Sequence, residues 1–69
     1  MAYTSLSAAQ MECLRLLIAS RDLDQIASAL GTSTPHVEEQ LDAACVRLGV
    51  RSRFEAAVIA TELGLIPNP

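Results

Sequence analysis

Few side chains in this 69-residue chain are of types that do covalent or metal chemistry. Cys13 and Cys45 are its two thiols, His36 is its one imidazole, and Ser33 and Ser52 stand at predicted helix starts. His36 has no second histidine and no nearby cysteine, so the ligand spacing of a zinc site is absent. Neither serine has a base beside it, as a nucleophilic hydroxyl requires. The sequence predicts neither an enzyme nor a protein that holds a metal or another cofactor.

Carboxylates are the one chemical group that gathers in a segment. Between residues 22 and 42 there are five of them and no lysine or arginine: Asp22, Asp24, Glu38, Glu39 and Asp42. Glu38 and Glu39 are consecutive, so on a helix they point in different directions and do not suit paired acid–base catalysis. The net charge is −3 and there is no lysine, which argues against nucleic acid and anionic membranes as partners. The same charge balance permits a basic protein as a partner.

The composition predicts one small globular domain over residues 1–69. Apolar residues are 51% and charged residues 19% of the chain, which suits a packed core rather than a disordered tail. Aromatic residues are scarce, so aliphatic side chains must build the core. The two cysteines lie in helical patterns and are expected to be buried, reduced thiols. No signal peptide and no apolar run of ~18 residues is visible, so we expect a cytoplasmic protein, in a bacterium or in the bacterial host of a phage, with no membrane segment.

The elements that position these side chains are predicted to be helices, because apolar residues recur with helical spacing. We expect an all-α fold with helices at about residues 8–19, 23–30, 35–48 and 53–63. A capping residue precedes each helix. Three of the caps can form capping boxes: Ser7 with Gln10, Asp22 with Gln25, and Ser52 with Glu55. The third helix is capped by Ser33 or Thr34. Glycines follow the last three helices. The side chains expected in the core are Leu14, Leu17, Ile18, Ile26, Ala27, Leu30, Val37, Leu41, Ala44, Cys45, Leu48, Ala56, Ala57, Ala60 and Leu63.

A short second helix, a tight glycine turn and a longer third helix form the helix-turn-helix arrangement. The segment at residues 48–53, Leu-Gly-Val-Arg-Ser-Arg, followed by Glu55-Ala56, resembles the signature of LuxR/GerE-type DNA-binding domains. Further positions fall at the family's spacing without a gap: Leu14 to Leu17, Ile26-Ala27, Leu30-Gly31, Ser33, Val37 and Leu63-Gly64-Leu65. The resemblance covers about residues 6–66 and implies a four-helix LuxR-type helix-turn-helix domain.

In that family the third helix enters the major groove, and basic or polar residues just after the position of Val37 contact DNA. The resemblance places Glu38, Glu39, Gln40 and Asp42 at those contacts. Phosphates need cations or N–H donors, and a carboxylate can read only cytosine N4. Each such inversion costs about 1–2 kcal/mol after screening, against the ~4–10 kcal/mol that separates specific from non-specific binding. We therefore expect DNA binding to be weak or absent.

The resemblance also implies that the last helix dimerises. Glu55, Val58, Ile59 and Glu62 form a stripe at helical spacing beside the expected core positions. Adjacent apolar residues on the surface of a small domain favour an interface, although one of the two fits the core equally well. We expect a homodimer through this helix, or a heterodimer with a related domain.

The function that these features favour is inhibition of a LuxR-type transcription regulator. The acidic face of Glu38, Glu39 and Asp42 would cover the regulator's DNA-binding domain, or the last helix would form inactive heterodimers. Small anti-activators of quorum-sensing regulators, including phage-encoded ones, are proteins that this chain resembles. Three alternatives stay open: a solvated acidic surface, docking to an unrelated bacterial target, and a DNA-binding regulator of unusual specificity. In the last case a basic corner would grip phosphates, namely Arg47, Arg51 and Arg53; its simpler role is to support helix ends.

Overall fold

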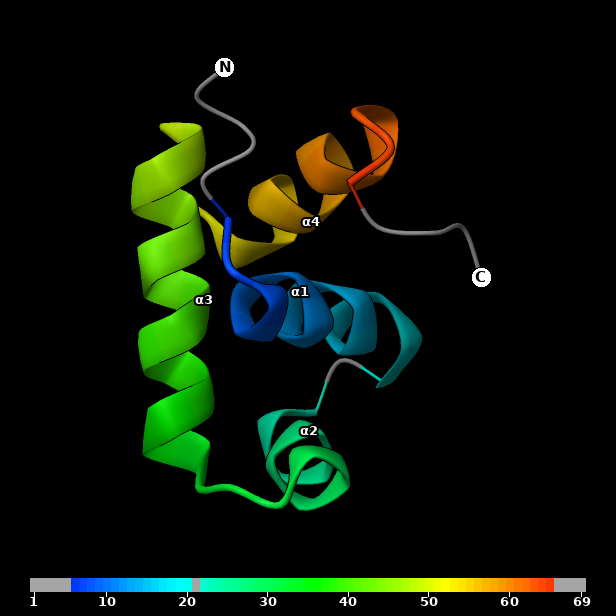
Figure 1. Ribbon diagram of the computed structural model, residues 1–69, viewed down its shortest axis with the longest axis vertical. Helices are drawn as coiled ribbons and strands as arrows, with labels where there is room; N and C mark the ends of the chain where they lie inside the picture. The colour runs from blue at the N-terminus through cyan, green and yellow to red at the C-terminus, as the bar shows by residue number, and fades with distance from the viewer. Residues whose placement is uncertain (1–5, 21, 66–69) are drawn as a thin grey trace.

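The described part of the computed structural model, residues 6–20 and 22–65, contains four helices and no strand (Figure 1). They are α1 (Ala8–Ser20), α2 (Leu23–Leu30), α3 (Thr34–Leu48) and α4 (Arg53–Glu62). The predicted all-α, four-helix fold is confirmed, and each boundary lies within one residue of its expected place. Figure 1 shows α3 running along one side of the molecule, with α4, α1 and α2 stacked beside it.

The helix starts follow from local hydrogen bonds. At α1 the predicted capping box forms, because Gln10 N–H donates to Ser7 Oγ at 3.1 Å and Ser7 N–H donates to Gln10 Oε1 at 3.0 Å. At α3 the cap is Ser33, whose Oγ accepts from His36 N–H at 3.3 Å. Thr34 is the first helical residue and Pro35 lies in the first turn, where its missing N–H leaves no bond unmade.

At the starts of α2 and α4, the capping side chain bonds to an N–H group one residue nearer than the sequence suggested. Asp22 Oδ1 accepts from Asp24 N–H at 3.0 Å, and Ser52 Oγ accepts from Phe54 N–H at 3.2 Å. Both donors lie two residues after the cap, whereas the predicted boxes place the donor three residues on. The capping residues are confirmed, and each still satisfies one of the N–H groups that a helix start leaves without a partner.

The turn between α2 and α3 depends on Gly31. Its φ is +69°, and the next amide, Thr32 N–H, donates to Ala27 O at 2.9 Å, which ends α2 in a left-handed cap. Nothing lies within 4 Å of the place where a Cβ would stand, so the backbone conformation, and no steric contact, selects glycine. The turn directs α3 away from α2 after only three residues.

Replacing Gly31 by alanine therefore tests the turn without disturbing any packing. The left-handed conformation costs an L residue about 1 kcal/mol, so we expect Gly31→Ala to lower the free energy of unfolding by that amount and Tm by about 4–8 °C. Thermal unfolding followed by circular dichroism measures both. An unchanged Tm would mean that the turn relaxes to another conformation.

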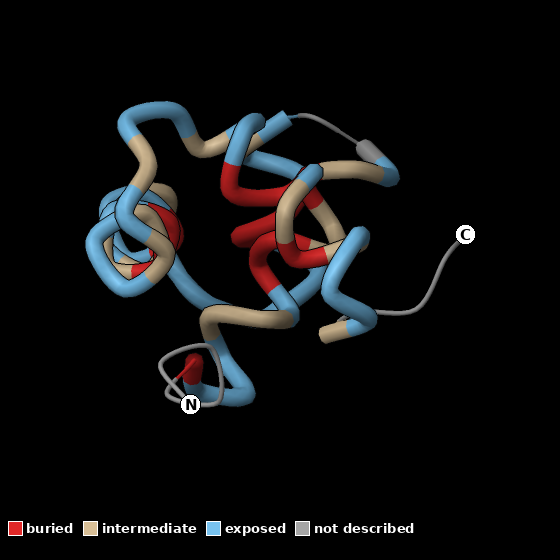
Figure 2. The backbone as a smooth tube through the Cα atoms, turned by 90° about the horizontal axis from the view of Figure 1, so that it is seen from above, coloured by how far each residue is buried: buried red, intermediate tan, exposed pale blue. Residues whose placement is uncertain are grey.

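Aliphatic side chains from all four helices form one core. Figure 2 shows the buried stretches of the backbone on the inner sides of the helices. The buried residues are Leu6, Cys13, Leu14, Leu17, Ile26, Ala27, Val37, Leu41, Ala44, Ala56, Ala57 and Ala60. Three other predicted core residues, Ile18, Cys45 and Leu48, are partly buried against this cluster. Small alanines on α4 let its backbone approach α1 and α3 closely.

The prediction of a core position was wrong for two residues. Leu30 is 36% exposed and Leu63 is 45% exposed. Leu30 is the last residue of α2, and it lies at the edge of a depression between α1 and α3. Leu63 follows the last residue of α4, and the chain turns at Gly64 so that Leu65 packs on the core instead. Both residues lie at a helix end, where the neighbouring elements leave part of the side chain uncovered.

Candidate protein-binding surfaces

The outer face of α3 carries the predicted acidic residues. Glu38, Glu39 and Asp42 are all exposed, while the opposite side of the helix buries Val37 and Leu41. The structure thus brings the three carboxylates to the solvent side of one helix. We call Glu38, Glu39 and Asp42 the acidic face.

One member of the acidic face has a cationic partner. The Arg53 guanidinium donates to Asp42 Oδ1 at 3.4 Å, from the first residue of α4 across to α3. The side chains are 29% and 71% exposed, so the pair contributes at most about 1 kcal/mol. Among the described residues no ion pair is formed by Glu38 or Glu39. The charge of the acidic face is therefore offset at one end only.

One arginine of the predicted basic corner is in an ion pair. Arg53 pairs with Asp42 of the acidic face, whereas Arg47 and Arg51 are exposed. Arg47 lies in the last turn of α3, where a cation interacts favourably with the helix dipole.

Asp24, a further carboxylate of the acidic segment, has a structural role. Thr34 Oγ1 donates to Asp24 Oδ1 at 2.7 Å, which joins the first turn of α2 to the first residue of α3. This bond spans the α2–α3 turn and helps to fix the direction in which α3 leaves it.

An apolar residue on the acidic side of α3 was not predicted. Val46 is 80% exposed. It lies nine positions after Val37, and at 100° per residue that is half a turn out of phase with the buried side of the helix. Helical phase alone would have found it. An exposed apolar side chain therefore lies next to the acidic face, toward the C-terminus of α3.

The predicted stripe on α4 is mostly exposed. Glu55, Val58 and Glu62 face solvent, and Ile59 is half-buried. Phe54, which the sequence reasoning left unassigned, is 56% exposed, as is Val58 four residues later. Residues four apart share a helix face, so Phe54 and Val58 form one exposed apolar ridge, which we call the α4 ridge. Ile59 contributes less to the surface than predicted.

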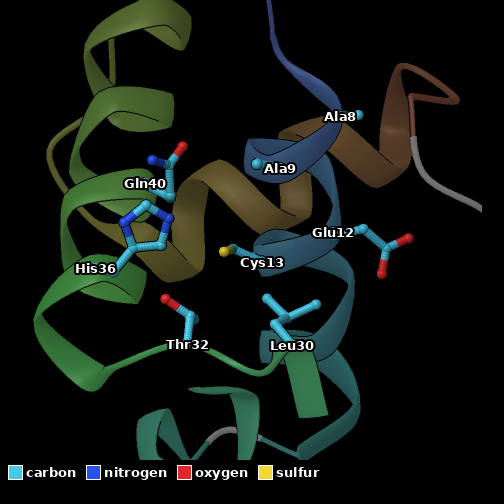
Figure 3. Close-up of a pocket in the computed structure, with 8 residues that line it drawn as sticks. All are labelled: Ala8, Ala9, Glu12, Cys13, Leu30, Thr32, His36 and Gln40. Atoms are coloured by element: carbon cyan, nitrogen blue, oxygen red, sulfur yellow. The ribbon is translucent and has the colours of Figure 1, made fainter. Parts of the chain in front are cut away.

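A shallow depression of about 280 Å³ lies between α1 and α3 (Figure 3). Figure 3 shows His36 and Gln40 projecting from α3 on one side, and Cys13 from α1 beneath. Four of the eight residues that line it are apolar, namely Ala8, Ala9, Cys13 and Leu30. The volume falls below the ~300 Å³ at which small-molecule sites begin. Within residues 6–20 and 22–65 no cluster of side chains is arranged to hold a metal.

Burial and polar neighbours shift the pKa values of Cys13, Glu12 and Cys45. Burial raises the pKa of the Cys13 thiol, and the nearby Glu12 carboxylate adds to the effect. A hydrogen bond from Arg15, at 2.7 Å, lowers the pKa of Glu12. Burial and then Asp42 raise the pKa of Cys45. Both cysteines are free thiols that stay protonated at neutral pH. They are poor nucleophiles.

The two cysteines should differ in reactivity. Cys13 is 1% exposed, whereas Cys45 is only partly buried. We expect iodoacetamide at about pH 8 to modify Cys45 first and both thiols far more slowly than in the unfolded chain. Mass spectrometry of peptides from a time course gives the order. Faster modification of Cys13 would show that α1 opens readily from the core.

No protein-family model, curated protein or solved structure matches this chain. The likeness to LuxR/GerE-type domains therefore stands on the residues that carry it, and the surfaces described above are the basis for a function. None of the four helices has the length and apolar character needed to span a bilayer, within the part of the chain that the structure describes.

Proposed function

We propose that this chain is a protein-interaction domain that does not bind DNA and that inhibits a LuxR-type transcription regulator by binding its DNA-binding domain. The observation that carries this proposal is the exposed acidic face of α3. The resemblance places this face where a LuxR-type domain presents basic or polar residues to DNA. The charge of the chain is therefore inverted on the surface that corresponds to the DNA-contacting face of a LuxR-type domain.

DNA binding is opposed by this charge pattern. Glu38 and Glu39 would meet phosphates with no cation of their own, and only Asp42 has an arginine beside it. A DNA-binding surface gains much of its affinity when lysine and arginine release condensed counterions. Carboxylates give no such gain, and their repulsion grows as the salt concentration falls.

A basic protein surface complements the same face. A LuxR-type DNA-binding domain offers such a surface on its own recognition helix, and carboxylates spaced along α3 would occupy it as phosphates do. Val46 adds an apolar contact at one end of the acidic face. Charge complementarity of this kind mainly sets partner choice and the rate of association. Occupying the recognition helix would prevent the regulator from reaching its operator.

Two assays in parallel test the proposal. The purified chain should co-purify with a LuxR-type DNA-binding domain, and it should not shift labelled DNA at low salt. Sub-micromolar DNA binding, or no complex with any of a panel of LuxR-type domains, would contradict it.

A second candidate is a DNA-binding regulator of unusual specificity. The exposure of Arg47 and Arg51 favours it, because both guanidinium groups are accessible to phosphates. This function requires that Arg51→Ala weaken DNA binding at low salt, whereas the proposed function predicts no DNA binding to weaken.

A further inference from the structure

The α4 ridge is an exposed apolar feature that the proposed function does not use. Phe54 and Val58 lie four residues apart and are equally exposed, at 56% each. Phe54 is one of only two aromatic residues in the chain, and it stays on the surface. Burying such a side chain is favourable, and aromatic residues are enriched where proteins bind one another. The ridge therefore has the character of an interface.

The exposed charged residues of α4 itself are acidic. Glu55 and Glu62 are exposed on the solvent side of the helix, and the one basic residue of α4, Arg53, pairs with Asp42 on α3. A helix that carries positive charges beside its apolar stripe would complement the two carboxylates.

A second copy of the chain is poorly suited to this surface. Two-fold pairing of α4 would gather four carboxylates, Glu55 and Glu62 from each copy, around a single apolar contact. This like-charge repulsion opposes the homodimer that the sequence had suggested.

We propose that the α4 ridge binds an amphipathic helix of another protein, one whose apolar stripe is flanked by lysine or arginine. Apolar side chains of the partner cover Phe54 and Val58, and its cations pair with Glu55 and Glu62. This interface lies on a different helix from the acidic face, so its failure leaves the proposed function standing, and the reverse also holds.

Two synthetic helical peptides of about 18 residues, long enough to hold a helix, test the chemistry. Both carry leucines at i, i+3, i+4 and i+7, and the flanking positions are lysine in one and glutamate in the other. Fluorescence anisotropy with the full chain should show the lysine peptide binding at least ~10-fold more tightly, and less so at high salt. Equal affinities would overturn the proposal.

Three variants locate the binding. Val58→Asp should weaken binding of the lysine peptide at least ~10-fold. Val46→Asp, the same change at an exposed valine on α3, should alter the affinity less than about twofold. The pair Glu55→Lys and Glu62→Lys should reverse the preference in favour of the glutamate peptide. An equal loss in Val46→Asp, or an unchanged preference in the charge-swapped pair, would place the peptide elsewhere and overturn the proposal.

Sedimentation equilibrium of the chain alone shows whether the ridge binds a second copy of the chain. We expect the mass of a monomer, 7.4 kDa, at micromolar concentration. A dimer that Val58→Asp converts to a monomer would show that the ridge is a self-association surface and would overturn the proposal.

Discussion

Replacing Leu41 by alanine is expected to lower the free energy of unfolding by about 2–5 kcal/mol. Leu41 is fully buried in the middle of α3, the helix that packs on α1, α2 and α4. A domain of this size draws only ~3–5 kcal/mol from its core. The cavity left by the substitution is therefore expected to consume most of the stability, and the variant should be largely unfolded near 37 °C.

Val46→Ala is the matched control for this prediction. It also shortens an aliphatic side chain on α3, but Val46 is 80% exposed, so the free energy of unfolding should change by less than about 0.5 kcal/mol. Urea unfolding followed by circular dichroism measures both variants. Equal effects at the two positions would show that α3 does not sit on the core as described.

The double substitution of Glu38 and Asp42 by lysine is expected to weaken binding to a LuxR-type DNA-binding domain by at least ~10-fold and up to ~1,000-fold. Each reversal removes an attraction and adds a repulsion, at about 1–2 kcal/mol per site after screening, and 1.4 kcal/mol is tenfold in Kd. Titration calorimetry gives the two values of Kd. The ion pair of Asp42 with Arg53 is exposed, so its loss should affect stability by at most about 1 kcal/mol.

A charge-matched control separates the acidic face from net charge. Glu12→Lys on α1 changes the net charge as much as Glu38→Lys does, and Glu12 is likewise exposed. Its ion pair with Arg15 is on the surface and contributes little. We expect Glu12→Lys to leave Kd within about threefold. A loss equal to that of Glu38→Lys would mean that overall charge, and not α3, governs binding.

Features set by neighbouring residues could be predicted from the sequence. The caps at Ser7, Asp22 and Ser52 and the left-handed Gly31 depend on hydrogen bonds within a few positions. Leu30 was predicted in the core because it shares a helix face with the buried Ile26, but as the last residue of α2 it is only partly covered.

Features that depend on how helices pack could not be predicted in the same way. The Arg53–Asp42 pair joins residues 11 apart on two helices, and only their packing brings the two charges together. The exposure of Phe54 could have been predicted from helical phase, because it lies four residues before Val58 and away from the alanines that were expected in the core. Both proposed surfaces follow from the phase of a single helix.

A competition titration tests most directly whether the acidic face acts on a DNA-binding domain. Labelled operator DNA is held by a LuxR-type DNA-binding domain, and the chain is added while fluorescence anisotropy of the DNA is followed. The proposed function predicts that anisotropy falls to the value of free DNA, and that the Glu38→Lys, Asp42→Lys variant leaves it high. An anisotropy that stays constant or rises as the unmodified chain is added would contradict inhibition through α3.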